Sequence, residues 1–108
     1  MLKDDLLQLW NNFGDERCGV ILASGKIKEL PNIHPDPTNY FAMDAKELKK
    51  KNIIASWHTH PTTGPNLSVA DYKGFLLFPH LDHYIVAENQ CWKYKVDTEN
   101  ETIILEDF

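Results

Sequence analysis

The stretch SWHTHPTTGPNLSVAD, residues 56–71, decides how the rest of the chain is interpreted. Its first two residues end a short, branched apolar run, residues 53–57, that predicts a buried strand delivering His58. Residues two apart in a strand project from the same face, so His58 and His60 should stand side by side. Two imidazoles with one carboxylate are the ligands of a catalytic zinc ion that keeps a fourth position open for water.

Asp71 is the candidate carboxylate, and it has a simpler interpretation as well. Ser68 followed three residues later by an acid is close to a capping box, and most such pairs only begin a helix. An acid in the first helical turn can also turn inward and bind a metal. The seven residues 61–67 are enough to fold the helix start back over the histidines.

A zinc site that activates water also needs a general base within hydrogen-bond reach of that water. Glu16, just before the apolar run of residues 18–23, is the candidate, because strand pairing could bring it beside the histidines. The alternative is that Glu16 is one more exposed acid among the sixteen of the chain. Likewise, an isolated pair of histidines two residues apart is often only a pair of surface residues.

Composition limits the class of protein. The 108 residues predict a single domain, residues 1–108, and 43% hydrophobic with 25% charged residues is ordinary for a globular protein. A net charge of -5 argues against nucleic-acid binding. The sequence shows neither a secretory signal nor an apolar run that could span a membrane, so we expect a cytoplasmic protein with no membrane partner. Cys18 and Cys91 are then expected to be reduced thiols.

The remaining patterns predict a mixed α+β sheet flanked by helices. Expected helices are residues 2–12, 45–51 with Asp44 as N-cap, and 68–78. Residues 40–43 should be extended, and the Pro-rich segment 34–39 cannot be helical. Expected strands are residues 18–23, 26–33, 53–57, 83–88 and 91–96 across an Asn89-Gln90 turn, and 102–105.

Together these residues resemble the JAMM metalloprotease family, also called MPN+ or JAB. Glu16 before an apolar strand, His58-Thr59-His60-Pro61, and then Ser68-x-x-Asp71 match its five functional positions in order. The resemblance covers nearly the whole chain, and it implies the cytidine-deaminase-like JAB/MPN fold. Within the family, the chain looks most like the prokaryotic JAB domains of phage tail-assembly proteins.

The resemblance also implies an activity. His58, His60 and Asp71 would bind Zn²⁺, Glu16 would be the general base, and Ser68 would donate its hydroxyl to the oxyanion. The expected reaction is hydrolysis of an amide or isopeptide bond in a protein or peptide, as in phage tail assembly or at the C-terminus of a ubiquitin-like protein.

Two other functions remain open at this point. A scaffold or adaptor domain of the same fold could keep zinc for stability alone, and a binding module without metal would make the motifs coincidences. His34, His80 and His83 are expected to be surface or packing residues rather than ligands, and Trp57 to belong to the core. The sequence does not determine the oligomeric state.

Overall fold

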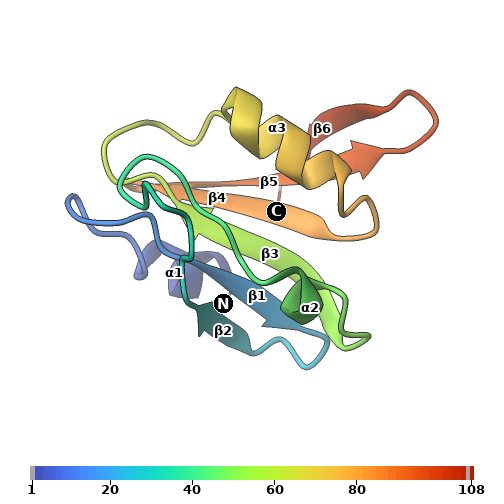
Figure 1. Ribbon diagram of the computed structural model, residues 1–108, viewed down its shortest axis with the longest axis horizontal. Coiled ribbons are helices and arrows are strands. Elements are labelled where there is room, and N and C mark those ends of the chain that lie inside the picture. The colour runs from blue at the N-terminus through green and yellow to red at the C-terminus, as the bar shows by residue number, and fades with distance from the viewer. Residues whose placement is uncertain (1, 107) are drawn as a thin grey trace.

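The computed structural model describes residues 2–106 and residue 108, and it shows one six-stranded mixed sheet with three helices (Figure 1). The sheet order is β2-β1-β3-β4-β5-β6. In chain order the elements are α1 (Leu2–Leu7), β1 (Cys18–Leu22), β2 (Ile27–Leu30), α2 (Ala45–Leu48), β3 (Ile53–Thr59), α3 (Val69–Leu76), β4 (Asp82–Ala87), β5 (Gln90–Asp97) and β6 (Thr102–Glu106). The expected α+β class is confirmed.

The sheet is mixed because one connection crosses over. Strand β1 pairs antiparallel with both β2 and β3, and β4, β5 and β6 are also successive antiparallel neighbours. Strands β3 and β4 are parallel, so the chain must return over the sheet between them, and α3 makes that return. This crossover places the start of α3 above the end of β3, where the histidines lie.

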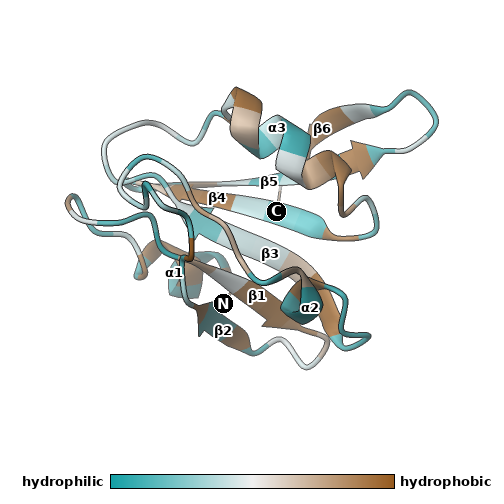
Figure 2. Ribbon diagram, viewed as in Figure 1, coloured by the Kyte–Doolittle hydropathy of each residue, from teal (hydrophilic) through white to brown (hydrophobic). Residues whose placement is uncertain are grey.

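Alternation along the strands divides the core between two faces. On one face, Leu6 of α1 packs with Ile21, Trp57 and Tyr84. On the other face, Phe75 of α3 packs with Ile85, Tyr94 and Val96. A separate apolar cluster on the α2 side holds Val20, Leu30, Leu48, Ile53 and Leu81. The strands carry most of the apolar colour in Figure 2, whereas the connecting loops are mainly teal or pale.

Helices α1 and α2 are shorter than expected. Helix α1 ends at Leu7 rather than residue 12, because the Leu9 carbonyl accepts a hydrogen bond from the Arg17 guanidinium at 2.6 Å. Helix α2 ends at Leu48 rather than residue 51. The chain has to leave the helix before Asn52, because the Asn52 carbonyl accepts a hydrogen bond from the Ala23 amide at 2.7 Å.

Other boundaries moved by a few residues. Strand β2 ends at Leu30 rather than 33, α3 ends at Leu76 rather than 78, and β3 runs on through His58 to Thr59. The hairpin turn lies at residues 88–89 rather than 89–90, with Asn89 in the left-handed region at φ 56°. Residues 40–43 lie outside the described sheet, although Ala42 accepts a hydrogen bond from the Ile33 amide at 2.9 Å.

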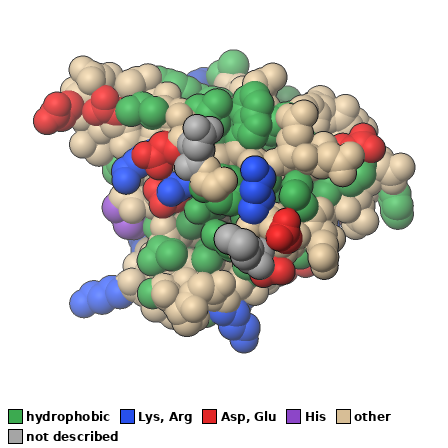
Figure 3. Space-filling view, turned by 180° about the vertical axis from the view of Figure 1, so that it is seen from behind, with side chains coloured by type: hydrophobic (Ala, Val, Ile, Leu, Met, Phe, Trp, Pro, Cys, Tyr) green, Lys and Arg blue, Asp and Glu red, His purple; other side chains and the backbone are tan. Residues whose placement is uncertain are grey.

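The remaining predictions about the chain concern its thiols and its surface. Both cysteines are free and buried, as expected. Among the described residues, none of the helices is long and apolar enough to cross a membrane. Seen from behind, basic and acidic side chains are interspersed among apolar ones (Figure 3). Lys93 is one example, since it lies 3.6 Å from Asp82 and 3.4 Å from Glu106.

Candidate metal centre

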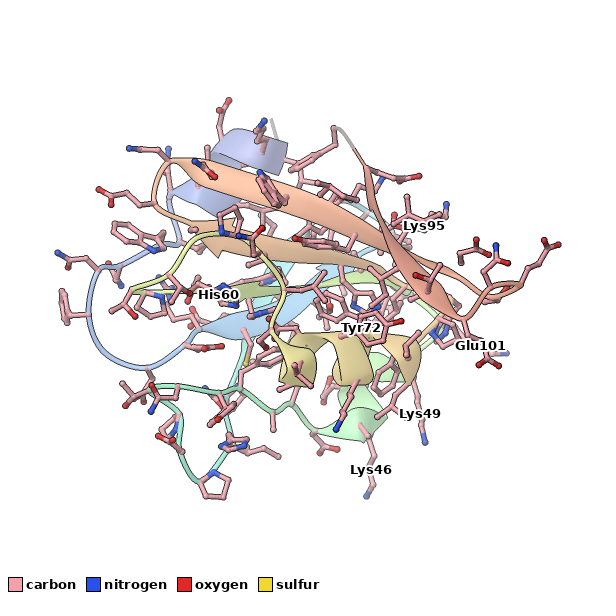
Figure 4. All side chains as sticks on the ribbon, turned by 90° about the horizontal axis from the view of Figure 1, so that it is seen from above. Lys46, Lys49, His60, Tyr72, Lys95 and Glu101 are labelled. Atoms are coloured by element: carbon pink, nitrogen blue, oxygen red, sulfur yellow. The ribbon has the colours of Figure 1, made fainter. Side chains whose placement is uncertain are left out.

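Strand β3 presents Ser56 and His58 on the face of the sheet that α3 covers, and His60 follows directly after the end of the strand. The period of two places Trp57 on the opposite face, where it is fully buried in the core with α1. Both imidazoles are buried, with 0% of His58 and 6% of His60 exposed, and their Nε2 atoms are 3.1 Å apart. In Figure 4, His60 lies inside the molecule beside the β3–α3 loop, while Lys46 of α2 and Lys49, directly after it, extend into solvent.

Asp71 joins this pair from the first turn of α3. Its Oδ1 lies 3.1 Å from His58 Nε2, and its Oδ2 lies 3.2 Å from His60 Nε2. The capping box is also formed, because Ser68 Oγ accepts from the Asp71 amide and the Asp71 carboxylate accepts from the Ser68 amide, both at 3.0 Å. The two interpretations of this motif are therefore compatible: the same carboxylate begins the helix and faces both histidines.

The hydrogen bonds of His60 fix which nitrogen carries its proton. Nδ1 lies 2.9 Å from the Gly64 carbonyl, which can only accept, so Nδ1 donates. In the neutral ring, Nε2 then holds a lone pair that faces the Asp71 carboxylate. Two acceptors in contact require a cation, either as a proton on the ring or as a metal ion between them. Burial alone would lower the pKa of His60, but Asp71 and the Gly64 carbonyl together raise it.

The other two groups respond to burial and to each other. Burial would raise the pKa of Asp71, but its contacts with both imidazoles and with Ser68 hold it well below its usual range. Burial lowers the pKa of His58 despite the opposing effect of Asp71. The site is therefore a carboxylate facing at least one neutral imidazole, as metal binding requires.

The spacing of these atoms fits a small tetrahedral ion. Zinc binds nitrogen and oxygen at about 2.0–2.1 Å, so ligand atoms of a tetrahedral site lie about 3.3 Å apart. The two imidazole Nε2 atoms are 3.1 Å apart, and Asp71 approaches each with a different oxygen, Oδ1 at 3.1 Å from His58 and Oδ2 at 3.2 Å from His60. His60 also donates its second nitrogen to a carbonyl, as ligating histidines usually do. His58 lacks that support, because its buried Nδ1 has no hydrogen-bond partner among the described residues.

Glu16 is buried, with 8% exposed, rather than one of the exposed acids. Its neighbour Arg17 extends the pairing of β1 with β3: the Arg17 carbonyl accepts from the Thr59 amide at 2.8 Å. Thr59 lies between the two histidines in sequence, so this bond brings Glu16 beside them. Among the described residues, Glu16, His58 and His60 form a group whose ligand atoms all lie within 4.8 Å of one another and could hold a metal ion.

The segment before α2 holds the backbone of Glu16 on both sides. The Glu16 amide donates to the Pro37 carbonyl at 2.8 Å, and the Glu16 carbonyl accepts from Asn32 Nδ2 at 2.9 Å. Asn32 Oδ1 in turn accepts from the amides of His34 and Ala42, both at 3.1 Å. Asn32 therefore ties Glu16 to the loop whose Phe41 ring stacks on His58 with 4.1 Å between centroids.

The carboxyl group of Glu16 is poised to exchange a proton near neutral pH. Burial raises its pKa to about 7, which His60 opposes and Asp71 reinforces. A buried acid with a pKa near neutrality is suited to general acid–base catalysis, because both of its protonation states are then populated.

These groups open into a cavity of about 550 Å³ that Glu16, His60, Ser68 and Asp71 help to line. Ser68 is exposed at its mouth. Its Oγ accepts from the Asp71 amide, which leaves its hydroxyl proton free to donate. The structure thus brings the five predicted residues to one region, four of them buried and Ser68 at the opening.

The same cavity contains a polar pair that the sequence analysis did not predict. His83 Nδ1 lies 2.6 Å from Ser56 Oγ, and His83 Nε2 lies 3.1 Å from the Phe78 carbonyl. The two residues are directly paired in the parallel β3–β4 register. The available signal was Ser56, which shares the period of two with His58 and His60. His80 is exposed, and His34 is half-buried against the ring of Tyr40 at 5.1 Å, both as expected.

The chain matches no protein-family model, and no curated protein sequence matches it. Its fold is similar to the solution structure of protein DSY2949 from Desulfitobacterium hafniense, with a TM-score of 0.62 and 20% sequence identity. The match covers 86% of this chain and 76% of that one. At this identity, the similarity supports a shared arrangement of strands and helices and says nothing about activity.

Either Asp71 or Glu16 could be the third ligand of the metal. Replacing each carboxylate by its amide tests which of them binds. We expect Asp71→Asn to weaken zinc binding by more than about 100-fold, the upper range for losing a residue that only orients a ligand. Glu16→Gln should leave affinity nearly unchanged, because Asp71 contacts both imidazoles more closely. Competition with a fluorescent chelator measures the zinc affinity of each variant. The matched control is Glu88→Gln, which replaces an exposed acid. The reverse ranking of the first two variants would make Glu16 the ligand.

The buried His83 predicts acid sensitivity of folding. Burial lowers its pKa to about 4; the Phe78 carbonyl opposes this, and His58 and His80 reinforce it. Since the unfolded histidine titrates near 6.5, the folded state resists protonation, and its stability is lost as pH falls from about 6.5 to 4. In metal-free protein, the stability advantage of wild type over His83→Gln should shrink by about 1.4 kcal/mol per pH unit in this window.

Urea unfolding at each pH measures that difference. The control is Thr98→Ser, an exposed substitution in the β5–β6 turn that adds and removes no titratable group. Its difference from wild type should not change with pH. A constant difference between wild type and His83→Gln would show that His83 titrates normally in the folded protein.

Proposed function

We propose that this chain is a zinc-dependent hydrolase of amide or isopeptide bonds, of the JAMM type that the sequence resembles. The observation that carries the proposal is the buried contact of Asp71 with both His58 and His60, with Glu16 beside them and an open cavity in front. The proposal includes the JAB/MPN-type, cytidine-deaminase-like fold, which the mixed sheet and the α3 crossover support.

In this proposal His58, His60 and Asp71 hold the metal, and Glu16 and Ser68 assist the reaction. A bound zinc ion supplies Lewis acidity, which makes water more acidic and polarises a carbonyl group. Glu16 accepts a proton from the attacking water and passes it to the amine that leaves, a role suited to its position and its pKa of about 7. The Ser68 hydroxyl donates to the oxygen that becomes negatively charged, since its oxygen is already occupied by the Asp71 amide.

The cavity favours catalysis over a purely structural metal. Structural zinc sites are typically closed by four protein ligands, whereas catalytic sites have three and an open position. With His58, His60 and Asp71 as the ligands, a fourth position would stay open, and the cavity gives a substrate access to Glu16, His60 and Asp71. The substrate is a protein or peptide under this proposal; a phage tail-assembly protein and the C-terminus of a ubiquitin-like protein are the two candidates that the resemblance supplies.

The general base can be tested by a substitution that keeps the metal. Zinc-loaded protein is incubated with a peptide library and with isopeptide-linked lysine substrates, and products are identified by mass spectrometry. We expect Glu16→Gln to lower the rate of any cleavage by about 100-fold or more with one zinc per chain retained. Glu88→Gln, an exposed acid in the β4–β5 turn, should cleave at the wild-type rate.

Two results would contradict the proposal. A Glu16→Gln protein that cleaves as fast as wild type would exclude the assigned base. Wild-type protein that binds zinc and melts at a higher temperature with it, but cleaves none of these substrates, would favour the scaffold with a structural metal.

A further inference from the structure

The cavity extends well past the residues that the proposed reaction uses. Its lining includes Ser56, Leu81 and His83, which are only 4%, 1% and 2% exposed. Ser56 precedes His58 by two residues on the same face of β3, so it lies about 6.6 Å further along the strand. The cavity therefore reaches from the metal end to an inner part lined by residues about two positions further back along β3.

Met43, Leu48, Phe78 and Leu81 belong to one apolar cluster, and all four also line the cavity. Met43 and Leu48 line it on the α2 side, and Phe75 and Phe78 line it on the α3 side. Phe75 also stacks on the His83 ring, with 4.2 Å between centroids and 8° between planes. The acidic groups of the cavity, Glu16 and Asp71, belong to the metal end. A ligand in the inner part must be neutral, because a charge would be buried there without a partner.

Ser56 and His83 form the floor of the inner cavity, and the Ser56 oxygen can accept a hydrogen bond there. The Phe78 carbonyl can only accept, so His83 Nε2 donates to it and His83 Nδ1 carries the lone pair. Ser56 must then donate its hydroxyl proton to Nδ1 across the 2.6 Å contact. Its oxygen keeps its lone pairs, and among the described residues no side chain or amide donates to it.

We propose that the inner cavity is a specificity pocket for a tyrosine side chain next to the bond that is cut. An aromatic ring fits between the walls of Met43, Leu48, Phe75 and Phe78, and a phenol hydroxyl can donate to Ser56 Oγ. A lysine would bring a charge with no carboxylate at the floor, and a phenylalanine would leave the Ser56 acceptor unpaired. This inference rests on the proposed function, since it takes the metal end as the place of cleavage.

Three hydroxamates allow binding to the metal and binding to the inner cavity to be measured separately. Each is titrated calorimetrically into zinc-loaded protein: acetohydroxamic acid, phenylpropanohydroxamic acid, and its para-hydroxyphenyl counterpart. Acetohydroxamic acid reports the metal alone, and the aryl compounds also reach the inner cavity. We expect wild type to bind the phenol about threefold to tenfold more tightly than the phenyl compound, the usual range for one neutral hydrogen bond.

Substitutions test whether the preference for the phenol depends on Ser56, and whether the aryl group occupies the space beside Met43. Ser56→Ala should bind both aryl compounds equally, while Ser24→Ala, at an exposed turn, should keep the wild-type preference. Met43→Trp should fill the pocket, so both aryl compounds bind no better than acetohydroxamic acid. This second variant keeps the test valid if Ser56→Ala does not fold.

Each other outcome counts against a defined claim. Equal binding of phenol and phenyl compounds by wild type would overturn the tyrosine pocket and leave the metal centre intact. Aryl compounds that bind wild type no better than acetohydroxamic acid would show that the inner cavity admits no side chain. Failure of all three compounds to bind would contradict the metal centre and, with it, both proposals.

Discussion

The contact between the Asp71 carboxylate and the imidazoles of His58 and His60 is the interaction on which the rest of the site depends. It gathers a carboxylate and two histidines, all nearly buried, within 3.2 Å of one another. Such a cluster is costly to bury unless its groups are paired. The pairing fixes the start of α3 over the sheet, and α3 in turn supplies one wall of the cavity. Helix start, metal ligands and cavity thus share one constraint.

Parallel pairing of β3 with β4 creates the second part of the site. A parallel neighbour requires a crossover, and the crossover contains both the loop that carries Gly64 and the helix that carries Asp71. The same pairing sets His83 beside Ser56 on the cavity floor. One topological feature therefore joins a polar metal end to an apolar pocket with a single acceptor. The proposed cleavage next to one preferred side chain would use both parts.

Sequence reasoning could reach what depends on local periodicity and loop length, and it left open or missed what depends on contacts between particular distant residues. The period of two placed His58 and His60 together, and the seven-residue loop allowed Asp71 to reach them. The burial of Glu16 depends on Asn32 and Pro37, which lie 16 and more residues away and bind its backbone. Ser56 and His83 are separated by 27 residues and meet only through the strand register. The end of α1 was misplaced because Arg17, a residue outside the helix, donates to the Leu9 carbonyl.

X-ray absorption at the zinc edge of zinc-loaded wild-type protein tests the central claim most directly. The account predicts a four-coordinate ion with two imidazole nitrogens at about 2.0–2.1 Å and oxygen ligands in the remaining positions. The same measurement on Asp71→Asn should show one oxygen ligand fewer, or no bound zinc. A sulfur ligand at about 2.3 Å would place the metal at a cysteine instead, and a spectrum without imidazole scattering would show that His58 and His60 do not bind it.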